Sequence, residues 1–223
     1  MTLANPQPLT IDVGKTTTVS ALLTRPALAS ACFVFAHGAG AGMTHPFMGA
    51  VAAGLAARNV ATLRYQFPYM EKHSKRPDPP AVAQATVRAA VDMAARTLPG
   101  VPLIAGGKSF GGRMTSQAHA KQPLANVCGL AFFGFPLHAA GKPSKERAAH
   151  LADIEIPMLF LQGTRDKLAE LELLKPVIAG LGERATLHLV EGADHSFHVP
   201  ARSGRKDDDV MHEMLDVLVE WAA

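Results

Sequence analysis

Short runs of apolar residues alternate along the chain with longer, alanine-rich segments whose apolar positions recur at helical spacing. The short runs predict strands, and several of them are apolar throughout rather than at every second position. Such runs are typical of a parallel sheet that is covered on both faces. The predicted strands are 17–24, 31–36, 60–64, 102–105, 127–133, 157–161 and 185–190, and the predicted helices are 46–58, 80–97, 110–121, 168–181 and 207–221.

This alternation with short loops predicts an α/β fold, with a doubly wound, mostly parallel sheet of about seven strands and helices on both faces. Local signals agree, since Pro79-Pro80 opens one predicted helix and three aspartates fill the first turn of the last, where they complement the helix dipole. The 223 residues suit one domain, 1–223, without a repeat or linker. Ligands are expected at the carboxyl ends of the strands.

The strongest chemical signal is the segment 106–112, GGKSFGG, which places G-x-S-x-G between a predicted strand and a predicted helix. A turn this tight leaves no space for side chains beside the serine, so glycines flank it. The turn holds Ser109 in strained geometry with its hydroxyl projecting from the sheet, and the helix N-terminus points N–H groups at the same place. A structural turn or a phosphate cradle is the alternative, but no Walker spacing and no complete G-x-G-x-x-G follows a strand here. Ser109 is the predicted nucleophile.

A serine hydroxyl needs a base, and ten histidines are available. His195 directly follows the predicted strand 185–190 and fits the chain order nucleophile, acid, histidine, so it is the predicted base. His198 is the nearest competitor, although a loop or capping role suits it better. His188 and His212 fall inside a predicted strand and a predicted helix, which favours structural roles.

The predicted acid is Asp166, which follows the strand before the histidine loop. A carboxylate there would accept the imidazole N–H, fix the tautomer and stabilise the imidazolium. An Asx turn or a helix N-cap is the structural alternative for this residue. Glu170 and Glu172 are fallback acids within the helix, and Asp194 is too close in sequence to His195 to reach its far ring nitrogen.

The segment 36–42, AHGAGAG, follows another predicted strand, and its small residues would let backbone N–H groups approach a developing oxyanion. The predicted oxyanion hole is formed by the N–H groups of Ala39 and Phe110, with Gly40 as a substitute for Ala39. His37 more plausibly braces this loop by hydrogen bonds than acts in catalysis. Residues that could line the substrate pocket, or simply pack beneath the loops, are His37, Tyr65, Phe67 and Phe135.

These segments, together with Gly163-x-x-Asp166 and Asp194-His195-Ser196-Phe197, resemble the α/β-hydrolase superfamily across nearly the whole chain. The segments 64–71 (RYQFPYME), 109–113 (SFGGR), 135–138 (FPLH) and 141–143 (GKP) are similar to the small dienelactone-hydrolase-like branch. That branch includes the testis-expressed hydrolase-like proteins and a hydrolase-like regulatory subunit of a histone acetyltransferase complex. True dienelactone hydrolases use a cysteine nucleophile, whereas this chain has Ser109, which favours ester hydrolysis.

The predicted function is therefore a serine hydrolase that cleaves a carboxylic ester, or a related thioester or peptide bond, through an acyl-enzyme intermediate. The alternative is a catalytically weak, hydrolase-like binding or scaffold module, which would not need Ser109, Asp166 and His195 together. A small-molecule acyl substrate is expected, with no cofactor and no metal. Only residues 134–156 separate two predicted strands, which is too few for a lid domain and predicts thin apolar cover and short acyl esters. The sequence does not indicate the substrate or the oligomeric state.

Composition adds little to this hypothesis. Apolar residues make up 48% of the chain and charged residues 18%, which is typical of a globular protein. The net charge is +3, and the basic clusters 72–76 and 202–206 lack interleaved aromatic residues, so no nucleic acid partner is expected. No apolar run approaches the roughly 20 residues that would span a membrane. Residues 1–15 lack the pattern of a signal peptide, and Cys32 and Cys128 predict buried strand thiols, so a cytoplasmic location is expected.

Overall fold

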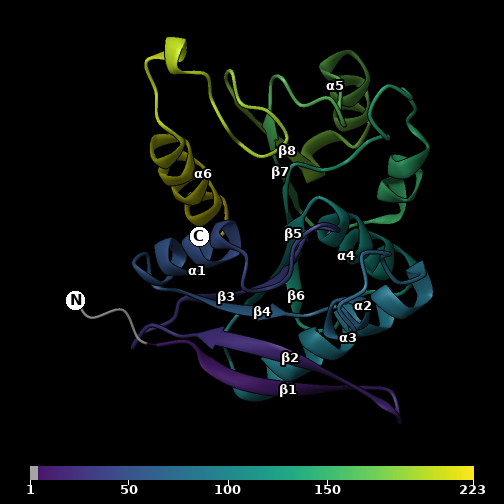
Figure 1. Ribbon diagram of the computed structural model, residues 1–223, viewed down its shortest axis with the longest axis vertical. Helices are drawn as coiled ribbons and strands as arrows, with labels where there is room; N and C mark the ends of the chain where they lie inside the picture. Colours follow the sequence, from purple (N-terminus) through teal and green to yellow (C-terminus); the bar gives the residue numbers. More distant parts are fainter. Residues whose placement is uncertain (1–4) are drawn as a thin grey trace.

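One sheet with the strand order β1-β2-β4-β3-β5-β6-β7-β8 forms the centre of the computed structural model, which describes residues 5–223 (Figure 1). β2 pairs antiparallel with both β1 and β4, and every other neighbouring pair is parallel. The strands are β1 (Gln7–Val13), β2 (Thr17–Thr24), β3 (Ala31–Ala36), β4 (Val60–Tyr65), β5 (Leu103–Lys108), β6 (Val127–Phe133), β7 (Met158–Gly163) and β8 (Ala185–Val190). The predicted mostly parallel sheet is confirmed, with one strand more than the seven predicted.

β1 is the strand that the hydrophobic pattern did not predict. Its sequence QPLTIDV contains a proline and an aspartate, which are rare in central strands. An edge strand tolerates both, because one side of its backbone pairs with no neighbour. Only Ile11 and Val13 are buried, and they pack against the core below β2.

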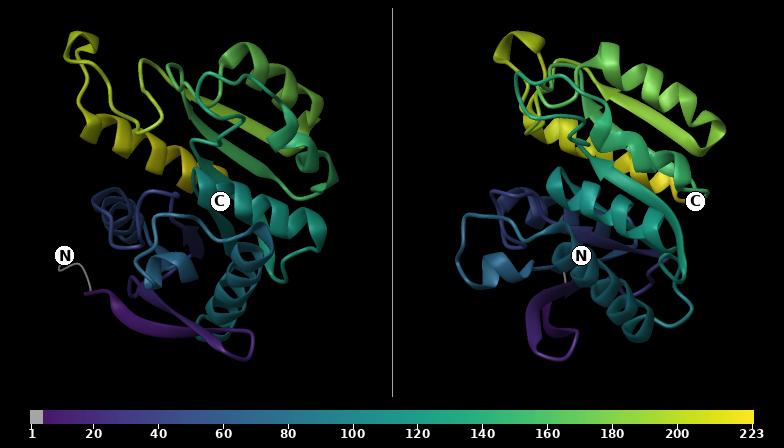
Figure 2. Two further views of the ribbon diagram at one scale, coloured as in Figure 1. Left: turned by 45° about the vertical axis from the view of Figure 1, so that its right-hand side comes forward. Right: turned by 90° about the vertical axis from the view of Figure 1, so that its right-hand side faces the viewer.

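Helices cover both faces of the sheet, as Figure 2 shows. α1 (Pro46–Ala56) and α6 (Asp207–Trp221) cover one face, and α3 (Pro80–Thr97), α4 (Phe110–Lys121) and α5 (Leu171–Gly180) cover the other. α2 (Pro68–Glu71) is a single turn that was not predicted. α3, α4 and α6 have the predicted bounds, whereas α1 ends two residues early and α5 begins three residues late.

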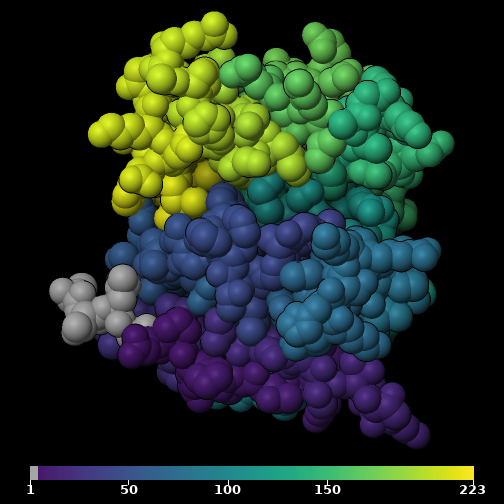
Figure 3. All heavy atoms as spheres, in the orientation of Figure 1, coloured from purple at the N-terminus to yellow at the C-terminus, as the bar shows by residue number. Residues whose placement is uncertain are grey.

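The two faces of the sheet belong to two apolar cores. In β3, Phe33 and Phe35 point toward α1 and α6, while Cys32 and Val34 point toward α3 and α4. All six side chains of β3 are buried, as are those of β4 and β7. This burial explains why the strand runs are apolar throughout. In the space-filling view, β1 and β2 (purple) and the C-terminal segments (yellow) lie at opposite ends of the molecule (Figure 3).

Cys32 is buried as predicted, but the prediction for Cys128 is wrong, because this thiol is exposed. Leu103 pairs with Val127 and Ile104 pairs with Gly129, so Cys128 is the extra residue of a bulge between β5 and β6. The bulge breaks the inward alternation of the strand and turns the side chain outward. The apolar neighbours in the sequence gave no sign of this irregularity.

The segment between β6 and β7 is short, as predicted. Apart from loops it contains one 3₁₀ helix, Glu146–Asp153, which packs against α4. It is too small to be a separate lid domain, so the carboxyl ends of the central strands are covered by loops. Within the described part of the chain, no helix is long and apolar enough to cross a membrane.

Candidate active site

Ser109 occupies a sharp turn between β5 and α4, with φ of 50° and ψ of −113°, a backbone conformation that non-glycine residues rarely adopt. The glycines on either side are required by close backbone contacts. A Cβ atom at Gly107 would lie 2.5 Å from the carbonyl oxygen of Ala36, and one at Gly111 would lie 2.5 Å from that of His37. The segment after β3 is thus pressed against the turn, and the serine hydroxyl is left at the carboxyl edge of the sheet.

The loops after β5, β7 and β8 bring the three residues Ser109, Asp166 and His195 together. The Oγ atom of Ser109 lies 2.9 Å from Nε2 of His195, and Nδ1 of His195 lies 2.6 Å from Oδ2 of Asp166. Because the carboxylate is an acceptor, Nδ1 carries the hydrogen and Nε2 presents its lone pair to the serine hydroxyl. These contacts are the ones that the predicted roles of nucleophile, base and orienting acid require.

Two further contacts fix the carboxylate of Asp166, whose side chain has no exposed surface. The amide nitrogen of Gln162 donates to Oδ2 at 2.5 Å, and the backbone N–H of Leu168 donates to Oδ1 at 2.8 Å. The Asx turn considered as an alternative for Asp166 therefore coexists with the contact to His195. Gln162 was not singled out in the sequence, although it is the one strongly polar side chain in the apolar run of β7.

The loop that carries His195 is organised by Asp194. Its Oδ1 atom accepts hydrogen bonds from the backbone N–H groups of Ser196 at 2.8 Å and His198 at 3.1 Å. The competing His198 points away and pairs with Asp207 at 2.9 Å. Gly163 allows the loop to approach β7, because a Cβ atom there would lie 2.4 Å from the carbonyl oxygen of Ala193. The remaining competitors lie elsewhere: His188 on β8 pairs with Glu213, and His212 lies on α6 beside Arg58.

The two predicted oxyanion donors come from two segments near Ser109. Phe110 is the first residue of α4, where the helix geometry leaves its N–H without an intrahelical acceptor. Ala39 lies in the loop after β3, and this loop passes close to Ser109, since a Cβ atom at Gly38 would lie 3.9 Å from that of Ser109. Tyr69 donates a hydrogen bond from its hydroxyl to the carbonyl oxygen of Ala39 at 2.9 Å, which fixes the conformation of this loop.

The structure corrects the expected pocket lining, because His37, Tyr65, Phe67 and Phe135 have 0% exposed surface. β4 extends through Tyr65, which places this side chain in the core. Phe67 and Phe135 also belong to the core, where the ring of Phe67 packs against Phe110. His37 braces its loop, as its Nδ1 lies 2.8 Å from the carbonyl oxygen of Gly38 and its Nε2 accepts the N–H of Phe67 at 3.1 Å. Burial lowers the pKa of His37 to about 4.

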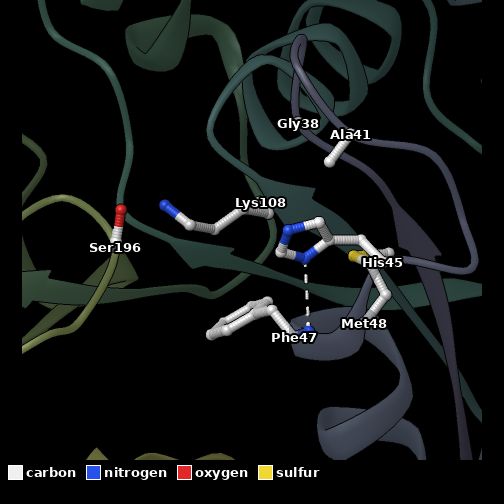
Figure 4. Close-up of a pocket in the computed structure, with 7 residues that line it drawn as sticks. All are labelled: Gly38, Ala41, His45, Phe47, Met48, Lys108 and Ser196. Atoms are coloured by element: carbon white, nitrogen blue, oxygen red, sulfur yellow. Dashed lines mark hydrogen bonds between the residues drawn. The ribbon is translucent and has the colours of Figure 1, made fainter.

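A pocket of about 130 Å³ lies between the β3–α1 loop, Lys108 and Ser196 (Figure 4). Its apolar wall comes from the first turn of α1, where the ring of Phe47 stacks on that of Phe197 at 6.0 Å. Its polar side chains are those of His45 at the start of α1, Lys108, which precedes Ser109, and Ser196, which follows His195. The lining residues are Gly38, Ala41, His45, Phe47, Met48, Lys108 and Ser196. The sequence did not identify this side of the site, because α1 carries no chemical motif.

The sheet order, the strained serine turn and the chain order of the three residues agree with a known family. The sequence model that describes the alpha/beta hydrolase domain matches residues 29–223. This chain belongs to the alpha/beta hydrolase family. The match covers every strand of the parallel part of the sheet and confirms the superfamily that the motifs resemble.

Solved structures of this alpha/beta hydrolase fold are similar over almost the whole chain. A dienelactone hydrolase from Anabaena variabilis is 19% identical, with a TM-score of 0.77 and coverage of 98% of this chain and 97% of the other. A serine hydrolase without a lid from Xanthomonas campestris is 20% identical, with a TM-score of 0.76 and coverage of 97% and 95%. The esterase domain of a Rhodothermus marinus protein is 15% identical, with a TM-score of 0.75 and coverage of 98% of both chains. At these identities the likeness shows a shared fold.

Proposed function

We propose that this chain is a serine hydrolase that cleaves a carboxylic ester of a small molecule through an acyl-enzyme intermediate. The observation that carries the proposal is the hydrogen-bonded series from Ser109 through His195 to Asp166, with distances of 2.9 Å and 2.6 Å. Hydrolase activity agrees with the family to which the chain belongs. The esterase and serine hydrolase named among the similar structures support the choice of an ester.

In the proposed acylation step, the Oγ atom of Ser109 attacks the ester carbonyl carbon while Nε2 of His195 takes the hydroxyl proton. Asp166 accepts the Nδ1 hydrogen, holds the tautomer and stabilises the imidazolium that forms. The negative charge on the carbonyl oxygen is stabilised by the N–H groups of Ala39 and Phe110. When the tetrahedral intermediate collapses, His195 returns the proton to the leaving alcohol, which leaves the acyl group on Ser109.

In the proposed deacylation step, a water molecule replaces the alcohol, and His195 acts as base again. The water oxygen attacks the acyl carbon, and the second tetrahedral intermediate uses the same two N–H donors. Its collapse releases the carboxylic acid and restores the hydroxyl of Ser109. One base thus serves both steps, because Nε2 gives up its proton at the end of each half-reaction.

We propose that the pocket lined by Lys108 and Ser196, the sequence neighbours of Ser109 and His195, takes the acyl group and limits its size. Its volume of about 130 Å³ is close to that of an apolar cavity of roughly 150 Å³ that binds benzene. We therefore propose a short acyl group, with about six non-hydrogen atoms or fewer, packed against Phe47 and Met48. A small soluble ester fits this pocket, whereas a long lipid chain does not.

The test of the proposed function is covalent labelling with a fluorophosphonate probe, followed by turnover of ester, thioester and peptide panels. We expect the probe to label wild-type protein on the peptide that contains Ser109, and we expect Ser109→Ala to remove the label. The matched control is Ser144→Ala, because Ser144 lies in the loop before the 3₁₀ helix and outside the pocket. A wild-type protein that takes up no label and turns over no ester would support the binding or scaffold alternative.

A further inference from the structure

Lys108 places a cationic side chain inside the catalytic region, where the proposed reaction steps do not use it. It is the last residue of β5 and directly precedes the nucleophile. Its Nζ atom donates a hydrogen bond to the backbone carbonyl oxygen of His195 at 2.5 Å. The same atom lies 5.1 Å from the centre of the Phe197 ring, within the range of a cation–π contact. The side chain of Lys108 thereby links the serine turn to the histidine loop across 87 positions of sequence.

Gly134 provides the space for this link. A Cβ atom at Gly134 would lie 3.1 Å from Nζ of Lys108 and 3.4 Å from Nδ1 of His195, so both side chains pack over this residue. Its φ of 68° also favours glycine. A backbone hydrogen bond also joins the serine turn to the end of β6, because the N–H of Ser109 donates to the carbonyl oxygen of Phe133 at 3.1 Å. The amine of Lys108 therefore lies between Gly134 after β6, the serine turn and the histidine loop.

The charges around the amine come from three directions. Asp166 faces it from the loop after β7, Asp194 and His195 face it from the loop after β8, and His45 lies across the pocket at the start of α1 (Figure 4). Burial lowers the pKa of Lys108 to about 8, against the opposing effect of the Asp166 and Asp194 carboxylates. The ammonium thus loses its proton within a few pH units of neutrality.

We propose that Lys108 is a positioning residue that holds the main chain of His195, and thereby keeps Nε2 in line with the hydroxyl of Ser109. This inference rests on the proposed function, because it assigns a task within that reaction. The ammonium acts through the carbonyl oxygen of His195 and does not contact the imidazole nitrogens. A charge-assisted hydrogen bond is stronger than a neutral one, so the loop is held most firmly when Lys108 is protonated.

Two consequences distinguish positioning from a purely structural contact. Misplacing reacting groups by about 1 Å can reduce a rate by about 10²-fold, so the loss of Lys108 should lower kcat far more than it changes KM. The rate should also decline as pH rises through the pKa of Lys108. An arginine stays protonated throughout this range, so Lys108→Arg should keep the activity and lose the alkaline decline.

The experiment compares wild type, Lys108→Met and Lys108→Arg, with Lys175→Met as the matched control on the exposed face of α5. Fluorophosphonate labelling rates and p-nitrophenyl butyrate kinetics are measured from pH 6 to pH 10, after circular dichroism has verified folding. For Lys108→Met we expect a loss in kcat of about 10²-fold at pH 7, a much smaller change in KM, and no alkaline decline in the labelling rate. Wild type should decline with a midpoint near pH 8, and Lys175→Met should follow wild type.

Two results would overturn the inference: a Lys108→Met variant as active as wild type at pH 7, or the same alkaline decline in wild type and in Lys108→Arg. If Lys108→Met does not fold, the comparison between wild type and Lys108→Arg decides on its own. If wild type is labelled and both Lys108 variants behave as wild type, the proposed function stands and this inference fails. If wild type is not labelled at all, the proposed function fails first.

Discussion

The Nε2 atom of His37 accepts a hydrogen bond from the backbone N–H of Phe67 at 3.1 Å, and the two rings meet edge to face with centroids 4.9 Å apart. The Nδ1 atom of the same imidazole lies 2.8 Å from the carbonyl oxygen of Gly38. A carbonyl can only accept, so Nδ1 carries the hydrogen and Nε2 must stay unprotonated. A second proton would break the contact to Phe67 and place a charge in a fully buried position.

This relationship predicts how stability depends on pH. Burial lowers the folded-state pKa of His37 to about 4, below the ordinary value of about 6.5 that applies in the unfolded chain. The unfolded chain therefore binds more protons between these values, so the free energy of unfolding falls as pH drops from about 6.5 to 4 and is unaffected above. His150 adds to the effect, because burial and the nearby Arg113 lower its pKa to about 4 as well.

Urea denaturation at several pH values between 7 and 4 measures this dependence. We expect His37→Gln to flatten the acid decline by as much as about 3 kcal/mol, which is the upper limit for a shift of this size. The variant keeps an acceptor for Phe67 but has no proton to gain. The matched control is His73→Asn, at an exposed position with a φ of 52° that asparagine tolerates, and it should leave the slope unchanged. An equal acid decline in wild type and His37→Gln would contradict the assignment.

The base is tested by His195→Ala. Because the nucleophile and its base act as a unit, we expect ester turnover to drop by about 10⁴-fold or more. His198→Ala is the matched control, since His198 is a neighbour in the same loop but pairs with Asp207 on the surface. Both variants are compared by kcat/KM for p-nitrophenyl butyrate and by the fluorophosphonate labelling rate. If His198→Ala lost most of its turnover while His195→Ala kept it, His198 would be the base and the assignment of His195 would be wrong.

The orienting acid is tested by Asp166→Asn. An amide nitrogen placed toward Nδ1 of His195 would favour the wrong tautomer, so we expect turnover to fall by about 10⁴-fold. The fold should persist, because the asparagine oxygen can still accept the N–H of Leu168. Circular dichroism and thermal melting separate the two effects. Turnover close to that of wild type would redirect the search for the acid to Glu170 and Glu172.

The sequence predicted most of the fold, because strands covered on both faces leave continuous apolar runs and the helices leave clear boundaries. It also led to the residues that the structure brings together, since each of Ser109, Asp166 and His195 follows a predicted strand. The contacts of Gln162 and Lys108 were not predictable in this way. A lysine at the variable position of G-x-S-x-G carries no signal of its own. Its contact with His195 exists only once the strands are placed side by side.

The errors have physical reasons as well. Tyr65, Phe67 and Phe135 follow strands whose carboxyl ends border the site, which suggested a pocket lining. The sequence could not show that β4 continues through Tyr65, nor that Phe67, at the start of the single turn α2, packs into the core. The pocket is lined by α1 instead, whose helical pattern resembles that of any buried surface helix.

The last prediction concerns acyl chain length. The pocket of about 130 Å³ is lined in part by Phe47 and Met48, and each methylene that it buries contributes about 0.8 kcal/mol. We expect kcat/KM for a series of p-nitrophenyl esters to rise by about fourfold per carbon while the pocket fills, and to fall beyond roughly five acyl carbons. Phe47→Ala removes the wall that stacks on Phe197, so the optimum should move to longer chains.

The matched control is Leu28→Ala, because Leu28 is an exposed apolar residue away from the pocket, and its chain-length profile should follow that of wild type. Detergent micelles should not increase the activity of either protein, because the chain between β6 and β7 is too short to form a mobile apolar lid that an interface could open. A wild-type kcat/KM that keeps rising beyond about eight acyl carbons, or an increase at the micelle surface, would require a deeper apolar tunnel than the wall formed by Phe47 and Met48 allows.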